Sequence, residues 1–120
     1  MFDWRDYEKL ARELRNGDEA AQRTAISRLY YSAYHRALHQ LEQSGGFIYS
    51  PNKPSHQQVW DAYLKQGGTF RALGMQGKRL RDNRAQADYA SLIPRLDDVV
   101  TESFRLAESL LHWLDQLQHN

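Results

Sequence analysis

The stretch "ISRLYYSAYHRALHQL", residues 26–41, decides the fold of this chain because its apolar side chains keep to one side of a helix. They follow the three- and four-residue spacing of one helix face, as Ile26, Leu29, Tyr30, Ala33, Ala37 and Leu41. A face this broad can pack against two neighbouring helices at once. The stretch therefore predicts a central helix around which the rest of the chain assembles.

Signals for helix ends on both sides extend this helix to residues 18–44. Asp18 can cap the first turn, and Gly45 with Gly46 ends the helix. Glycine and proline elsewhere separate four more helices, and the sequence GGFIYSPNKP at 45–54 is the one substantial loop. These helices are expected over residues 3–15, 55–66, 69–89 and 94–117.

The flanking helices carry start signals of their own. Asp3 and Ser55 are expected as N-caps, and Pro94 is expected in the first turn of the last helix. That last helix has the most regular apolar stripe of the chain, which is typical of bundle packing. β-branched residues are sparse, and no alternating strand pattern occurs. The sequence predicts an all-α protein, an antiparallel four- to five-helix bundle that forms one domain over residues 1–120.

The composition is that of a folded domain with little net charge. The 120 residues are 41% apolar and 26% charged, with a net charge of +1 and no cysteine. Disulfides and a thiol nucleophile are excluded, and a reducing cytoplasm is the expected compartment. The first residues are charged where a signal peptide needs an apolar run, and no segment has the roughly 20 apolar residues of a membrane span. Binding of nucleic acid would therefore depend on a local basic patch.

The charged stretch "RLRDNRAQADYA", residues 79–90, is the first candidate for such a patch. Arg84 falls on the apolar seam of its helix, and Arg81 and Asp88 flank that seam. Burying an unpaired charge is very unfavourable, so these side chains either satisfy one another or line a cleft for an anion. Residues 71–84 contain five Lys or Arg against one Asp. This local excess favours the anion, while a solvated charged face remains the simpler alternative.

The other face of the central helix is a second candidate. Arg28, Tyr31, His35 and His39 form a stripe there at helical spacing. His35 and His39 can bracket a zinc ion, but no third ligand occurs at a suitable spacing, so neither a metal nor a cofactor is expected. A helix–helix or subunit interface is the alternative for this stripe.

Three stretches in order resemble the HEPN superfamily, in particular its small single-domain branch: "RTAISRLYYSAYHRALHQLEQSG" (23–45), "SHQQVWDAYLKQGG" (55–68) and "LRDNRAQADYA" (80–90). The resemblance implies a helical bundle that dimerises, so that the polar motifs of two subunits meet in a shared cleft. It implies binding of RNA or a nucleotide ligand and metal-independent endoribonuclease activity, as a toxin-like component of a toxin–antitoxin or defence system. A minimal nucleotidyltransferase is the partner that it suggests.

The resemblance also points to site residues. In active family members an arginine followed by Asn or Asp precedes a histidine a few residues later. Arg81-Asp82 matches the start of this motif, but no histidine occurs between His56 and His112, so His35 or His56 would have to replace it. The expected catalytic residues are Arg81, Arg84, Asp88, Tyr89, His35 and His56. The expected RNA- or anion-binding residues are Arg28, Tyr31, Arg79, Arg81 and Arg84.

A non-catalytic role is the alternative to the nuclease. In it, Arg81, Arg84 and Asp88 form a structural ionic network between subunits, and the protein is a helical interaction module. A nucleotide-sensing module that uses the same cleft is a further alternative. The sequence leaves all three open.

Overall fold

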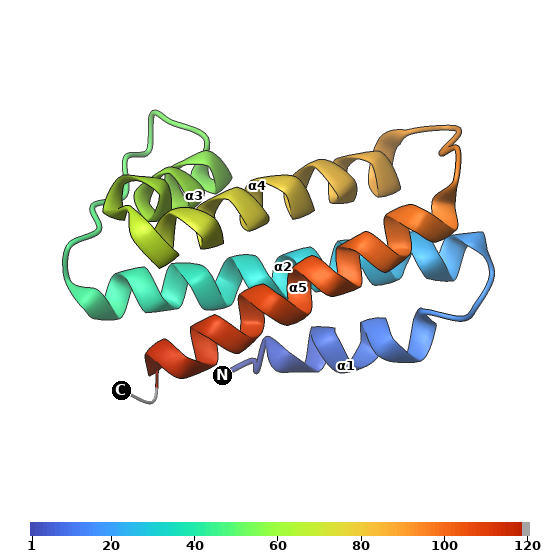
Figure 1. Ribbon diagram of the computed structural model, residues 1–120, viewed down its shortest axis with the longest axis horizontal. Coiled ribbons are helices and arrows are strands. Elements are labelled where there is room, and N and C mark those ends of the chain that lie inside the picture. Colours follow the sequence, from blue (N-terminus) through green and yellow to red (C-terminus); the bar gives the residue numbers. More distant parts are fainter. Residues whose placement is uncertain (119–120) are drawn as a thin grey trace.

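The computed structural model describes residues 1–118, and this part of the chain forms five α-helices. Figure 1 shows α2 through the centre, α1 and α4 antiparallel to it on opposite sides, and α5 crossing in front. The prediction of an all-helical bundle is confirmed for these residues. The helices are α1 (Arg5–Leu14), α2 (Glu19–Ser44), α3 (Ser55–Gln66), α4 (Gly68–Tyr89) and α5 (Leu96–Gln118).

The central position of α2 follows from the apolar face that the sequence predicts. All six residues of that face are buried, and α2 contacts each of the other four helices. Asp18 caps α2 as expected, since its carboxylate accepts a hydrogen bond from the backbone N–H of Ala21 at 2.9 Å. Gly45 ends the helix with a left-handed φ of 80°. The core of the bundle is therefore assembled around one helix.

The roles of residues at three helix starts differ from the predictions, although α3 begins at Ser55 as expected. Asp3 accepts a hydrogen bond from the backbone N–H of Arg5, but Trp4 occupies the N-cap position of α1. Ser55 is the first residue of α3 and makes no capping hydrogen bond, because Pro54 holds the N-cap position. Pro94 lies before α5, which begins only after Arg95 with its positive φ of 57°. The Arg95 carbonyl accepts the first backbone hydrogen bonds of α5, so Arg95 caps the helix and Leu96, not Pro94, lies first in it.

Close contact between α3 and α4 depends on two glycines. A Cβ at Gly77 would lie 2.2 Å from the indole ring of Trp60, and one at Gly74 would lie 2.8 Å from the Trp60 carbonyl. The absence of a Cβ at these two positions therefore permits the close approach of the two helices. Trp60 is fully buried as a result, with its ring against the backbone of α4.

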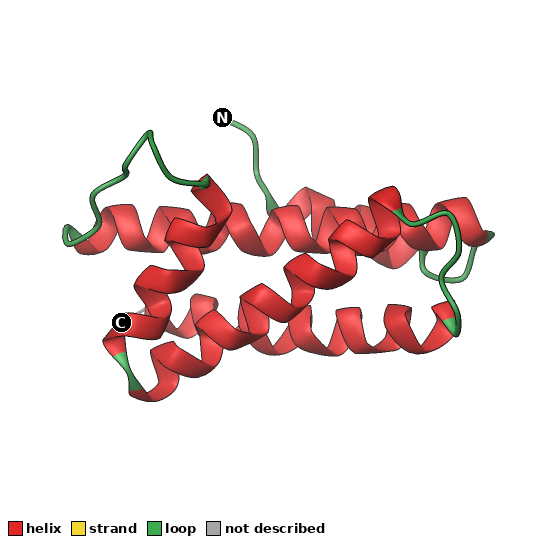
Figure 2. Ribbon diagram, turned by 90° about the horizontal axis from the view of Figure 1, so that it is seen from above, coloured by secondary structure: helices red, strands yellow, loops and turns green. Residues whose placement is uncertain are grey.

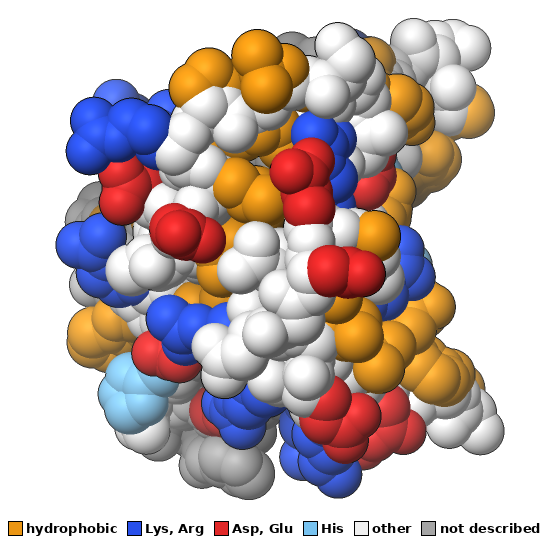
Figure 3. Space-filling model, turned by 90° about the vertical axis from the view of Figure 1, so that its right-hand side faces the viewer, with side chains coloured by type: hydrophobic (Ala, Val, Ile, Leu, Met, Phe, Trp, Pro, Cys, Tyr) orange, Lys and Arg blue, Asp and Glu red, His pale blue; other side chains and the backbone are white. Residues whose placement is uncertain are grey.

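The connections lie at the ends of the helices, and the longest of them, between α2 and α3, forms an arc in Figure 2. At the end of the bundle that holds the α1–α2 and α4–α5 connections, acidic and basic side chains are interspersed with apolar ones (Figure 3). Among the described residues, no helix is both long and apolar enough to cross a membrane.

Candidate functional site

The structure brings the charged seam of α4 together with the tyrosines of α2 and the first turn of α3. We call this group the imidazole–arginine cluster. Its aromatic members contact one another through their rings, and its arginines lie over or beside those rings. The members are Tyr30, Tyr31 and Tyr34 from α2, His56 from α3, and Arg81 and Arg84 from α4.

Two pairs of residues with i, i+4 spacing form the aromatic part of the cluster. Tyr30 and Tyr34 lie on one face of α2, and His56 and Trp60 lie on the facing side of α3. The His56 ring stacks on Tyr34 with centroids 4.2 Å apart and planes 11° from parallel. Its Nδ1 lies 2.6 Å from the Tyr30 hydroxyl, which also accepts a hydrogen bond from Trp60 Nε1 at 3.0 Å. His56 is therefore held in a defined orientation.

The surroundings of His56 keep it uncharged near neutral pH. Burial, and after it the positive charges of Arg84 and Arg81, lower the pKa of His56 to about 4. Burial raises the pKa of Tyr30 well above its ordinary value, so its phenol keeps the proton. The positive charge of the cluster is thus carried by the two arginines.

Arg84 is the most buried cation of the cluster. Its side chain is 13% exposed, and its guanidinium lies 5.4 Å from the Tyr30 ring centroid and 5.7 Å from that of Tyr31. Asp88, one turn further along α4, is its ion-pair partner at 3.5 Å. Arg84 Nε is buried and has no hydrogen-bond partner within residues 1–118. The charge of Arg84 is therefore only partly compensated.

Arg81 adds a second positive charge at the same place. Its field lowers the pKa values of both Tyr30 and His56, so its charge acts on the same two rings as that of Arg84. Its side chain makes no ion pair with any other described residue. Arg84 alone is thus paired with a carboxylate, that of Asp88, whose side chain is 30% exposed.

The stripe on α2 is covered in part by the N-terminal segment. His35 stacks on Trp4 with ring centroids 3.5 Å apart, and burial lowers its pKa. Arg28 lies over the rings of Tyr7 and Tyr31, at 4.6 Å and 5.2 Å. The stripe therefore forms a helix–helix contact, and Tyr31 connects it to the imidazole–arginine cluster.

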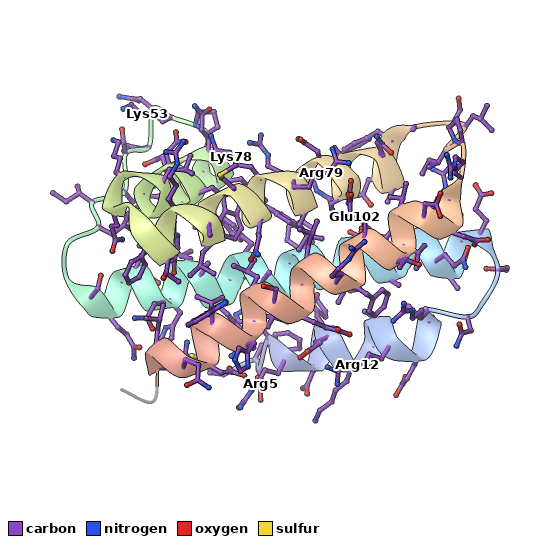
Figure 4. The ribbon with its side chains drawn as sticks, viewed as in Figure 1. Arg5, Arg12, Lys53, Lys78, Arg79 and Glu102 are labelled. Carbon is purple, nitrogen blue, oxygen red and sulfur yellow. The ribbon has the colours of Figure 1, made fainter. Side chains whose placement is uncertain are left out.

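Two residues expected in the site lie outside the cluster. Arg79 points to Glu102 on α5, where the two make an ion pair at 2.8 Å (Figure 4). Tyr89, near the end of α4, is 80% exposed. The positions of these two side chains follow from helix geometry. The 100° step per residue turns Arg79 and Tyr89 away from the side of α4 that carries Arg81 and Arg84.

Three contributing residues were read from the sequence only as apolar or motif positions: Tyr30, Tyr34 and Trp60. Their polar atoms and ring stacking matter because they orient His56. The available signal is the pairing of a Tyr-x-x-x-Tyr face with a His-x-x-x-Trp face, each at i, i+4.

No group of three or more His, Cys, Asp or Glu side chains that could hold a metal ion occurs among the described residues. An open hollow beside the cluster is lined in part by Arg23, Ser27, Arg28 and Asp88. Comparison of the chain with protein-family models, with curated proteins and with solved structures finds no match.

Proposed function

We propose that this chain is a HEPN-like, RNA-binding protein that holds a phosphate group between Arg81 and Arg84. The observation that carries the proposal is the buried Nε of Arg84, which has no partner within residues 1–118 although the guanidinium is largely enclosed. A buried donor without a partner costs roughly 1 to 3 kcal/mol, and an anion that reaches Nε as the surrounding side chains move would recover this cost. Guanidinium groups bind phosphate oxygens in bidentate fashion, and two of them meet here.

The surrounding charges support an anion as the ligand. The one carboxylate paired with Arg84 belongs to Asp88, while Arg28 borders the same region through Tyr31. Tyr31 is half-buried beside these cations, so a base of a bound nucleotide would find an aromatic face next to the phosphate. In the dimer that the resemblance implies, the cations of two subunits would add to one binding surface.

Cleavage of the bound RNA is the second part of the proposal. Attack of the ribose 2′-oxygen on phosphorus requires a base for the 2′ proton and an acid for the leaving 5′-oxygen. His56 lies beside Arg84 and is the histidine that would stand for the absent motif histidine, as an uncharged donor to the phosphate, while water supplies the proton for the leaving 5′-oxygen. Asp88 would be the base. The protein would then be the toxin-like member of a toxin–antitoxin or defence pair, with a minimal nucleotidyltransferase as its partner.

The binding test uses fluorescence anisotropy with a labelled single-stranded RNA in EDTA. We expect the double variant Arg81→Gln, Arg84→Gln to bind at least about tenfold more weakly, and the slope of log affinity against log salt to fall by roughly 1 to 2. The matched control is Arg71→Gln, Arg79→Gln, which removes the same charge from α4 outside the cluster. Equal losses in both double variants would show non-specific attraction and overturn the proposal.

The cleavage test incubates structured RNA with the protein in EDTA. We expect products with 2′,3′-cyclic phosphate ends, loss of cutting in His56→Gln, and no cutting of an all-2′-deoxy substrate. If the RNA stays intact under all conditions while the protein still binds it, the protein is a binding module without nuclease activity. Loss of folding stability in Arg84→Met without any RNA binding by the wild type would instead favour the structural ionic network.

A further inference from the structure

The Trp60–Tyr30–His56 chain of hydrogen bonds determines which ring nitrogen of His56 carries hydrogen. Trp60 Nε1 can only donate, so the Tyr30 oxygen accepts from it at 3.0 Å. The hydroxyl hydrogen of Tyr30 then needs an acceptor, and the group within reach among the described residues is His56 Nδ1 at 2.6 Å.

The opposite arrangement leaves a buried polar hydrogen without a partner. If His56 Nδ1 carried hydrogen and donated to Tyr30, the tyrosine oxygen would accept twice and its own hydrogen would have no acceptor within the described residues. Tyr30 is 0% exposed, so water could not take that hydrogen. A neutral His56 with hydrogen on Nε2 satisfies the whole chain.

The second nitrogen of His56 is available to a ligand. Within residues 1–118 its Nε2 makes no hydrogen bond, and it is not among the buried atoms without a partner, so it meets solvent. The groups that face His56 are Tyr30, Tyr34, Tyr31 and His35 from α2, and Arg81 and Arg84 from α4. None of these is an anion, so nothing on these neighbouring helices competes with a phosphate for the Nε2 hydrogen.

We infer that Tyr30 is a positioning residue that holds neutral His56 with its hydrogen on Nε2, and that His56 thereby donates a hydrogen bond to the phosphate group bound by Arg81 and Arg84. The inference rests on the proposed function and names a third donor of the same site. It also assigns His56 Nδ1 to Tyr30, so this nitrogen does not act as a base while the chain of hydrogen bonds is intact.

The tautomer is measured directly by NMR on protein labelled with ¹⁵N-histidine at neutral pH. We expect His56 to show a protonated Nε2 and an unprotonated Nδ1, and Tyr30→Phe to abolish this preference. Tyr34→Phe is the matched control, because it removes a hydroxyl from the other tyrosine on the same ring but leaves the stacking in place. A wild-type His56 with its hydrogen on Nδ1 overturns the inference.

The ligand role is measured by calorimetric titration with inorganic phosphate, which gives the affinity of every variant, including those without His56. We expect Tyr30→Phe to weaken binding by about fivefold to tenfold and Tyr34→Phe to leave it unchanged. In a His56→Ala background, Tyr30→Phe should have no further effect on affinity, whereas a purely structural role would give the same loss with or without the imidazole.

Because Tyr30→Phe leaves the Trp60 N–H without its acceptor, the folded fraction of each variant is checked by circular dichroism. A second variant, Trp60→Phe with Tyr30 intact, removes that donor and is expected to retain the Nε2 tautomer. If His56 instead carries its hydrogen on Nδ1 in this variant, the Tyr30 hydrogen does not determine the tautomer, and the inference is overturned.

The two failures are distinguishable. If the wild type binds phosphate but Tyr30→Phe binds equally well, the role of Tyr30 and His56 is wrong and the proposed function stands. If the wild type shows no saturable response to phosphate while His56 carries its hydrogen on Nε2, the proposed function and the ligand part of this inference are overturned together.

Discussion

The bundle contains two nearly buried arginines, and they are compensated in different ways. The Arg36 side chain on α2 is 9% exposed and pairs with Asp115 of α5, a residue 79 positions away along the chain. The Arg84 side chain on α4 is 13% exposed, and its ion-pair partner is Asp88 on the same helix at 3.5 Å. The ion pair of Arg36 thus connects two helices of the core, whereas the ion pair of Arg84 lies within one helix.

The difference separates a charge that supports the fold from one that is free for a ligand. Asp115 is half exposed and reaches inward to Arg36, so the Arg36 pair includes a carboxylate supplied by a second element. Arg84 has a second arginine and an uncharged imidazole as neighbours, and its Nε is unpartnered among the described residues. Since net favourable ion pairs need a complete set of partners, the two sites are expected to respond oppositely to neutralisation.

The largest expected effect comes from Gly77→Ala, which breaks the cluster but not the Arg36 pair. The new Cβ would meet the Trp60 ring at 2.2 Å, and the buried indole cannot move away without opening the core. We expect a loss of roughly 2 to 3 kcal/mol in the free energy of unfolding, measured by urea denaturation. Displacement of Trp60 should also remove the stabilisation of the protein by phosphate.

Gly46→Ala is the control for this variant. A Cβ at Gly46 meets nothing within 4 Å, and we expect its stability to match the wild type. If Gly77→Ala unfolds at the same urea concentration as Gly46→Ala, the close contact between α3 and α4 does not support the site.

Neutralising each arginine tests the comparison itself. Methionine keeps most of the buried stem and removes the charge. We expect Arg36→Met to lose about 1 to 2 kcal/mol, because it gives up a charged hydrogen bond, and Arg84→Met to stay within about 0.5 kcal/mol of the wild type or to gain stability. Thermal and urea unfolding with and without phosphate measure both effects.

The phosphate response separates the two arginines further. Arg36→Met should keep the full increase in melting temperature with phosphate, and Arg84→Met should lose it. Similar destabilisation in the two variants, with an unchanged phosphate response in both, would make Arg84 a structural residue like Arg36.

The fold could be predicted from the sequence because its determinants are local. The buried face of α2, the Asp18 cap and the Gly45 terminus each follow from spacing within a few residues. Even the contact at Gly77 is indicated by a glycine inside a helix. The start of α3 at Ser55 was predicted correctly, but the capping role of Ser55 and the helix start at Pro94 were wrong, because a proline or a positive φ one residue away decides them.

The site could be predicted only in part because it joins three helices. The seam position of Arg84 follows from counting residues along α4. The same count shows that Arg79 and Arg81 lie on different sides of the helix, so Arg79 could have been excluded from the site. The contact of His56 with Tyr30 depends on how α3 docks after the 45–54 loop, which no local pattern specifies. The stacking of Trp4 on His35 is equally non-local.

The smallest expected effect is a pH dependence that belongs to the cluster and to His56 in particular. The pKa of His56 is about 4 in the folded protein and near its ordinary value of 6.5 in the unfolded chain. The unfolded chain therefore takes up a proton between pH 6.5 and 4 while the folded protein does not, so stability is full above pH 6.5 and falls as the pH falls to 4.

Because the ring is only half-buried, solvent screening reduces the effect, and we expect His56 to account for about 1 kcal/mol of lost stability between pH 7 and pH 5. The measurement is the difference in unfolding free energy between wild type and His56→Gln at the two pH values. His39→Gln, at an exposed histidine of α2 outside the cluster, is the control. Burial also lowers the pKa of His35, so this residue contributes to the pH dependence of stability in the same direction. The variant His35→Gln is therefore measured alongside. If removal of His56 leaves the wild-type slope unchanged, its imidazole takes up a proton over the same pH range in the folded and the unfolded protein, and burial and the charges of Arg84 and Arg81 then do not hold it uncharged.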